Sequence, residues 1–169
     1  MKELEYPFDS SFLLQKRRKL KKALLADGSA RMEKRIAVLG GSTTNDIVSM
    51  LELFLLNCGI QPVFYQSEYA QYWQDAMFDA PELTAFQPDL IFIHTTSRNI
   101  TEAPLPLSAS EQEVQDALER QYTHFTQMWE HLAATYHCPI LQNNFELPAT
   151  RLMGNRDGRD CHGMVWFIS

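Results

Sequence analysis

The hydrophobic residues of this chain gather in short runs that are separated by longer, periodic stretches. The runs predict four buried strands, because they are rich in β-branched and aliphatic residues and have glycine or proline in or beside them: 34–41, 61–66, 89–95 and 138–144. The run at 89–95 is continuous and does not alternate with polar residues. It therefore favours a parallel sheet that is covered on both faces.

Apolar residues recur at three- and four-residue spacing between these runs, which predicts helices at 10–26, 44–58, 67–78 and 110–136. Ser110 and Glu113 predict a capping box at the start of the last helix. Strands that alternate with helices indicate an α/β fold, with a doubly wound parallel sheet as the middle of three layers.

The predicted organisation is an N-terminal basic helical segment, 1–30, followed by one α/β domain, 31–169. The chain ends on the apolar sequence "MVWFIS", where a further element would be expected to begin. We therefore expect the sheet to be truncated at its C-terminus and the chain to be the N-terminal part of a longer polypeptide.

The net charge of the chain and its distribution limit the classes of molecule that it could bind. The chain of 169 residues has a net charge of −6, which argues against general nucleic-acid binding. The basic sequence "QKRRKLKK" at 15–22 is an exception, and it is either a solvated helix face or a docking surface for an acidic partner such as a carrier protein. No apolar run is long enough to cross a membrane, and the three isolated cysteines fit a reducing cytoplasm.

Polar residues follow three of the predicted strands and should meet at one edge of the sheet, where open α/β sheets bind ligands. The first group is the turn "GSTTND", which opens a helix, and the second is "HTTSRN". The third contains Gln142 and two asparagines. We expect six of these residues to bind a ligand: Gly41, Thr43, Asn45, Arg98, Asn99 and Asn143.

Ser42 permits three interpretations. It could be a nucleophile if a base lies nearby, part of an anion site on the helix N-terminus, or a residue in a turn where Thr43, Thr44 or Asn45 caps the helix. His162 is the best candidate base, and Asp157 and Asp160 lie nearby in the sequence, where either could orient it or hold an anion-binding arginine. The alternatives for that segment are an ordinary solvated loop and, with Cys161, an incomplete set of metal ligands.

Several long segments resemble the N-terminal region of FkbH-like proteins over about residues 13–169: "KRIAVLGGSTTNDIVSMLELFLLNCGI", "YAQYWQDAMFD", "FQPDLIFIHTTSRNI" and "LQNNFELPATRLMGNRDGRDCHG". The resemblance implies an SGNH-hydrolase-like, flavodoxin-like α/β domain that is followed by a HAD-superfamily domain. It also implies a role in loading a glyceryl or acyl unit onto an acyl carrier protein in polyketide-type biosynthesis.

The catalytic patterns of those families are altered in this chain. A HAD domain needs a DxDx[TV] motif, which is absent here, so Mg²⁺ is expected only for a downstream HAD domain and no cofactor is expected in this chain. The Gly–Asp–Ser block of SGNH hydrolases reads Gly–Gly–Ser at Ser42. The usual oxyanion asparagine falls at Arg98, with Asn99 shifted by one position.

The last SGNH block, Asp–x–x–His, has no match, because Asp160 and His162 are one residue too close. These departures favour a binding and recognition domain whose partners are an acyl carrier protein, or a phosphopantetheine-linked substrate, and the downstream HAD domain. Neither nucleic acid nor a membrane is expected as a partner. The alternative is a serine esterase or acyltransferase of the SGNH type that uses Ser42.

Overall fold

The computed structural model describes residues 1–78 and 80–169, and its centre is a four-stranded parallel sheet. The strands β1 (Met32–Gly40), β2 (Ile60–Gln66), β3 (Leu90–His94) and β4 (Ile140–Gln142) lie in the order β2-β1-β3-β4. All the pairings are parallel, and Gly40 of β1 lies opposite His94 of β3. The predicted α/β fold with a parallel sheet is confirmed.

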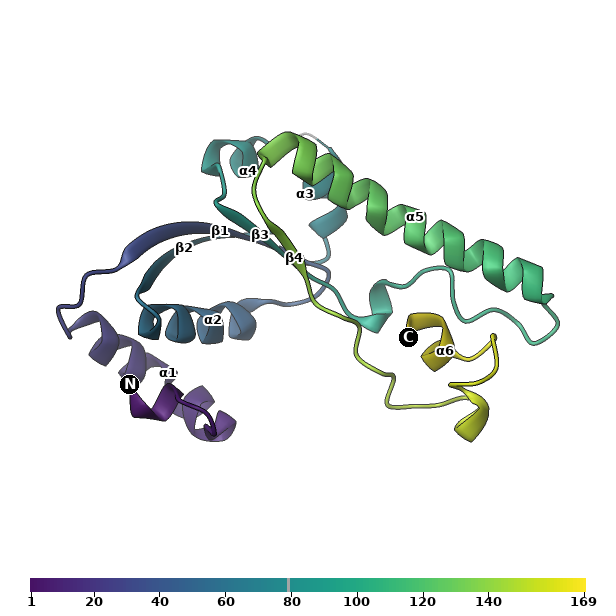
Figure 1. The fold of residues 1–169 in the computed structure, drawn as a ribbon, viewed down its shortest axis with the longest axis horizontal. Helices are drawn as coiled ribbons and strands as arrows, with labels where there is room; N and C mark the ends of the chain where they lie inside the picture. The colour runs from purple at the N-terminus through teal and green to yellow at the C-terminus, as the bar shows by residue number, and fades with distance from the viewer. Residues whose placement is uncertain (79) are drawn as a thin grey trace.

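Helices cover both faces of the sheet, as Figure 1 shows. One face packs on α2 (Asn45–Asn57), and the other packs on α3 (Tyr72–Met77) and α5 (Glu111–Tyr136). The alternation of side chains along β1 produces this division: Ala37 and Leu39 face the larger core with α5, while Ile36 and Val38 face α2.

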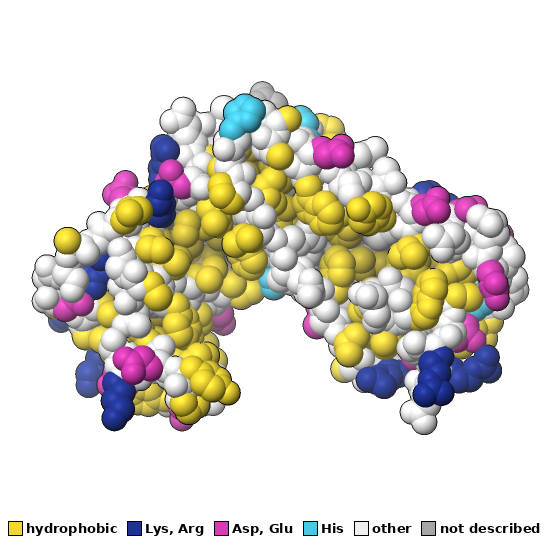
Figure 2. Space-filling view, in the orientation of Figure 1, with side chains coloured by type: hydrophobic (Ala, Val, Ile, Leu, Met, Phe, Trp, Pro, Cys, Tyr) yellow, Lys and Arg dark blue, Asp and Glu magenta, His cyan; other side chains and the backbone are white. Residues whose placement is uncertain are grey.

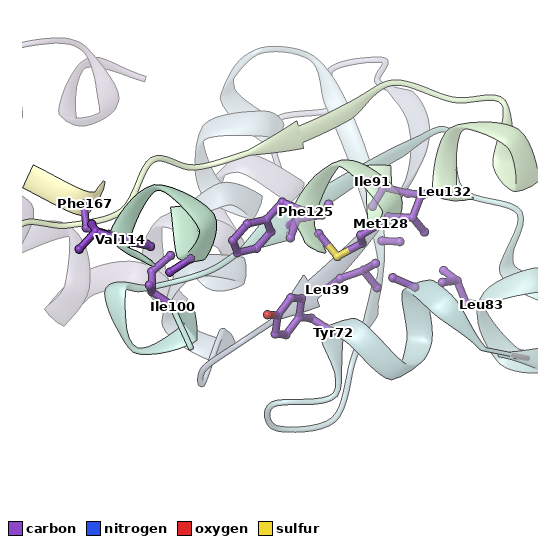
Figure 3. Close-up of a cluster of buried hydrophobic side chains, with 14 residues drawn as sticks. Leu39, Tyr72, Leu83, Ile91, Ile100, Val114, Phe125, Met128, Leu132 and Phe167 are labelled. Atoms are coloured by element: carbon purple, nitrogen blue, oxygen red, sulfur yellow. The ribbon is translucent and has the colours of Figure 1, made fainter. Parts of the chain in front are cut away.

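The larger core joins β1 and β3 to α3 and α5 (Figure 3). Leu39, Ile91 and Met128 are fully buried there. The same cluster continues through Ile100 and Val114 to Phe167 of the short helix α6 (Met164–Ile168), so the C-terminal segment is tied to the main body of the fold.

The N-terminal helix α1 (Ser10–Leu25) packs on the outer side of α2, away from the sheet (Figure 1). Leu13, Leu20 and Leu24 are buried against Leu53 and Leu56 of α2 in a separate apolar cluster, with Leu4 of the short 3₁₀ helix η1 (Lys2–Leu4). Asp9 begins the helix by accepting a hydrogen bond from the Phe12 amide.

Two predicted elements differ from the structure, and one further helix was not predicted. The helix predicted at 67–78 begins only at Tyr72, and a further helix, α4 (Pro81–Phe86), was not predicted. The last strand has three residues where seven were expected, because Asn143 turns its side chain back onto β3. The Ser110–Glu113 capping box is confirmed. In the part of the chain that is described, no helix is long and apolar enough to cross a membrane.

Candidate functional site

The carboxyl ends of β1 and β3 meet at the point where the chain reverses its direction of winding, since β2 lies on one side of β1 and β3 on the other. The Gly41 N–H donates a hydrogen bond to the His94 carbonyl at 2.8 Å. The Asn99 Nδ2 donates to the Gly41 carbonyl at 3.3 Å. The structure therefore brings Gly41 and Asn99, both expected at the site, into direct contact.

The two glycines allow this close approach. A Cβ atom at Gly41 would lie 2.5 Å from the Asn99 Oδ1, and one at Gly40 would lie 2.7 Å from the Thr44 Cγ2. Neither contact is compatible with a side chain unless a neighbour moves. The glycines are thus explained by packing at the end of β1, and a phosphate is not needed to account for them.

Asn143 joins the end of β4 to the end of β3. Its Nδ2 donates to the carbonyls of Thr95 and Asn144, both at 2.8 Å, which fixes its Oδ1 as the acceptor. The Oδ1 accepts from the Thr95 N–H at 3.0 Å and lies 3.2 Å from His94 Nδ1. His94 Nδ1 must therefore carry a proton, and in neutral His94 the lone pair is on Nε2.

The loop after β3 forms the 3₁₀ helix η2 (Ser97–Asn99), which Glu146 holds from the loop after β4. The Glu146 carboxylate accepts hydrogen bonds from the Ser97 N–H at 3.1 Å and the Ser97 hydroxyl at 2.9 Å. Burial raises the pKa of Glu146, but the hydrogen bonds from its own N–H and from Ser97 outweigh burial and leave this pKa below its ordinary value.

A pocket of about 390 Å³ opens beside η2. Its wall is mainly apolar, with Arg98, Ser97 and His162 among its polar residues. The apolar wall comes from the loop after β3, the segment between β4 and α6, and the first residue of α6: Ile100, Ala103, Pro104, Pro148, Leu152, Met153 and Met164. Arg98 is exposed. The pocket therefore presents the Arg98 cation beside an apolar surface, and the buried acid Asp157 also lines it.

His162 lies on this pocket with both of its ring nitrogens hydrogen-bonded. Its Nδ1 is 2.8 Å from the Asp160 Oδ1, and its Nε2 is 2.9 Å from the Ala109 carbonyl oxygen. Both partners are acceptors, so both ring nitrogens donate and the imidazolium is favoured. The hydrogen bond to Ala109, followed by the one to Asp160, raises the pKa of His162 above its ordinary value.

This arrangement gives His162 a structural task. It ties the turn at 160–163 to the residue before the Ser110 cap of α5, and neither ring nitrogen keeps a lone pair in the imidazolium form. The ligand atoms of Asp160, Cys161 and His162 lie within 4.8 Å of one another, but a metal would have to displace these hydrogen bonds. The hydrogen bond from the His162 ring, followed by the one from the His162 N–H, lowers the pKa of the Asp160 carboxyl.

Ser42 is half-buried at the turn between β1 and α2. In the part of the chain that the structure describes, its hydroxyl makes no hydrogen bond to a histidine or a carboxylate; His94 Nδ1 is bonded to Asn143, and His162 is bonded to Asp160 and Ala109. Thr44 occupies the N-cap of α2 but turns its hydroxyl towards Gln66, so the Thr44 side chain does not cap this helix. Thr43 and Asn45 are exposed beside it.

The site residues thus fall into two groups. Gly41, Asn99 and Asn143 are joined, directly or through Thr95 and Thr96, at the ends of β1, β3 and β4. Arg98 and His162 line the pocket on the other side of η2. The sequence interpretation missed the pocket wall, although Leu152, Met153 and Met164 are an apolar signal within a segment that reads as a polar loop.

One solved structure is similar to this chain. It is the crystal structure of the N-terminal part of the protein BF1531 from Bacteroides fragilis, described as containing a phosphatase domain complexed with Mg. The TM-score is 0.68 and the identity is 15%, over 90% of this chain and 39% of that one. The chain therefore shares the fold of a part of that structure and spans 39% of its length. No protein-family model matches the chain, and no curated protein matches it in sequence.

Proposed function

We propose that this chain is a recognition domain that binds a carrier-linked acyl or glyceryl unit for a phosphatase-type catalytic domain of the same protein. The observation that carries the proposal is the pocket beside η2, where the Arg98 guanidinium stands next to an apolar wall. A phosphopantetheine arm has the matching chemistry, since it joins a phosphate to a long and weakly polar chain.

One structural similarity and one sequence resemblance support a phosphatase-type domain as the catalytic partner. The similar structure from Bacteroides fragilis is described as containing a phosphatase domain, and the sequence resembles the region that precedes a HAD domain in FkbH-like proteins. This chain has no DxDx[TV] motif, so phosphoryl chemistry and its Mg²⁺ would belong to the other domain. The role of this domain is then to hold the substrate and to present it.

The charged and the apolar parts of the pocket would bind different parts of the phosphopantetheine arm. Arg98 would form charge-assisted hydrogen bonds with the phosphate, and such bonds are stronger than those between neutral groups. Ile100, Pro104 and Met164 would contact the chain of the arm and gain from removing it from water. The Ser97–Glu146 bonds hold η2 in place, so the cation is presented from a fixed turn.

The experiment is a calorimetric and NMR titration of the chain with phosphopantetheine. We expect saturable binding, with shifts at Ser97–Ile100 and in the 150–164 loop. Arg98→Ala should weaken it about tenfold, the loss of one charge-assisted contact, while the exposed Arg159→Ala serves as a matched control and should leave it unchanged. If phosphopantetheine does not bind, or if both variants weaken it equally, the recognition function is wrong.

A serine esterase or acyltransferase is the second candidate. Asn99 favours it, because its carboxamide lies against Gly41, the residue before Ser42, at the strand end where an oxyanion donor is needed. The base is missing from the arrangement, since neither His94 nor His162 is bonded to Ser42. The geometry therefore favours binding over catalysis, and the labelling experiment in the Discussion separates the two.

A further inference from the structure

Helix α1 concentrates positive charge on an acidic protein. It contains six of the fifteen basic residues of the chain and no acidic residue, whereas the rest of the chain has nine basic residues against twenty-one acidic ones. The exposed cations are Lys16, Arg18, Lys19 and Lys22, which we call the α1 ridge. Six of the fifteen cations thus lie on one helix at one end of the molecule (Figure 1), while Figure 2 shows that other Lys and Arg side chains lie at the opposite end.

The other two cations of α1 hold the helix in place. Arg17 lies 3.5 Å from the Asp46 carboxylate, and Lys21 lies 2.8 Å from that of Glu52, so both are paired with α2. The ridge residues have no such carboxylate partner within 4.0 Å among residues 1–78 and 80–169. The paired cations and the buried leucines fix which face of α1 is turned outward.

The ridge is unfavourable for the helix itself. Arg18 and Lys22 are like charges at i and i+4, and Lys19 is three residues from both Lys16 and Lys22, spacings at which like charges repel. A solvated helix face is usually built from alternating signs, which give favourable pairs at the same spacing. The ridge therefore has a pattern that makes the helix less stable and favours an external anion.

A shallow groove beside the ridge indicates which groups the anionic partner should present. Arg18, Lys21 and Lys22 surround Leu25 and Ala26, and Leu25 is 47% exposed. Carboxylates around an apolar side chain are the complement of this surface. A helix with acidic residues on either side of an apolar one would place its carboxylates on the cations and cover Leu25.

We propose that the α1 ridge docks an acidic amphipathic helix of a partner protein. A partner helix contacts the ridge alone, whereas an anionic membrane or a long nucleic acid would also approach the acidic remainder of the chain and be repelled by it. Naming that partner as an acyl carrier protein rests on the proposed function. The docking role of the α1 ridge is inferred from its charges alone.

The test uses an acidic acyl carrier protein in its apo form, without the phosphopantetheine arm, titrated against the chain at low salt. Arg18→Glu/Lys19→Glu should weaken binding about tenfold or more, since exposed charge pairs are each worth up to about a factor of five. The variant places a carboxylate four residues before Lys22, a favourable spacing on a helix, so its Tm should not fall. Binding should also weaken as salt is added.

The control is Arg151→Glu/Arg159→Glu, which changes the net charge by the same amount at two exposed positions far from α1 in the sequence and should leave binding intact. Equal weakening by both variants, or no binding of the apo carrier, overturns the docking proposal. So does stronger binding to vesicles of phosphatidylcholine and phosphatidylserine than to the carrier. Arg98→Ala should not change binding of the apo carrier protein. A failure of the docking proposal can therefore be distinguished from a failure of the proposed phosphopantetheine pocket.

Discussion

The Asn99 carboxamide occupies the space where a side chain at Gly41 would lie. Its Nδ2 donates to the Gly41 carbonyl at 3.3 Å, and its Oδ1 accepts from the Thr96 N–H at 2.8 Å. Asn99 thus holds η2 against the end of β1 and at the same time closes its own loop. The absence of a side chain at Gly41 is what permits this contact between the loops after β1 and β3.

Gly41→Ala should destabilise the chain by about 1–3 kcal/mol, the usual cost of forcing an extra methyl group into a packed site. The new Cβ would lie 2.5 Å from Asn99 Oδ1. Urea unfolding measures the change. Gly158→Ala is the control, because its Cβ would make an ordinary 3.5 Å contact with Val165. An equal loss in Gly41→Ala and Gly158→Ala would contradict the steric role of Asn99.

Asn143→Ala should lower the free energy of unfolding by about 1–3 kcal/mol, because the Thr95 N–H loses its acceptor in a half-buried site. It should also change the tautomer of neutral His94, since the contact that places the proton on Nδ1 is removed. Nitrogen NMR of the imidazole reports the tautomer. Asn144→Ala removes an exposed side chain and should alter neither quantity. An unchanged His94 spectrum in Asn143→Ala would disprove this assignment.

Gln121 supports the loop that leads into the pocket. It is 4% exposed, and its Oε1 accepts from the N–H groups of Thr101 at 2.8 Å and Glu102 at 3.2 Å. Gln121→Leu should destabilise the chain by about 1–3 kcal/mol because it leaves these donors unpaired. Gln121→Glu keeps an acceptor oxygen and should cost less if the new carboxyl stays protonated. Thermal unfolding of both variants tests the order, and the reverse order would contradict it.

The pattern of the sequence could predict the sheet and its covering helices because each depends on local periodicity. The strands around Val38 and Ile93 and the capping box at Ser110 needed only neighbouring residues to be recognised. The division of residues 67–86 into two helices could not be predicted, since it follows from packing: Tyr72 and Leu83 are both buried against the sheet in the larger core.

The candidate site was less accessible to sequence reasoning. The meeting of Gly41 with Asn99 follows from the rule that parallel strand ends share one edge, so its residues could be named in advance. The role of His162 could not, because its partner is the main-chain carbonyl of Ala109, 53 residues away, and a backbone acceptor leaves no mark in the sequence. The pocket wall was missed for a related reason, since its residues come from loops without periodicity.

The contact of His162 with Ala109 should make stability depend on pH. Because the pKa of His162 is raised in the folded chain, its contribution is fully present below the ordinary value of 6.5 and is lost as the pH rises through the raised value. Tm should therefore fall as the pH rises above 6.5 and through the raised pKa of His162. His162→Gln should remove this part of the profile, while the exposed His131→Gln should keep it. A profile that His162→Gln leaves unchanged would show that the imidazolium does not stabilise the fold.

Ser42 should resist a fluorophosphonate probe. A serine hydroxyl attacks such a probe only when a base removes its proton, and among the described residues neither His94 nor His162 is hydrogen-bonded to Ser42. Mass spectrometry of the treated chain should find Ser42 unmodified, at the level of Ser42→Ala. Rapid labelling that Ser42→Ala abolishes would favour the esterase or acyltransferase. In that case Asn99→Ala should slow the labelling as well, because its carboxamide is the side chain placed beside the turn to stabilise an oxyanion.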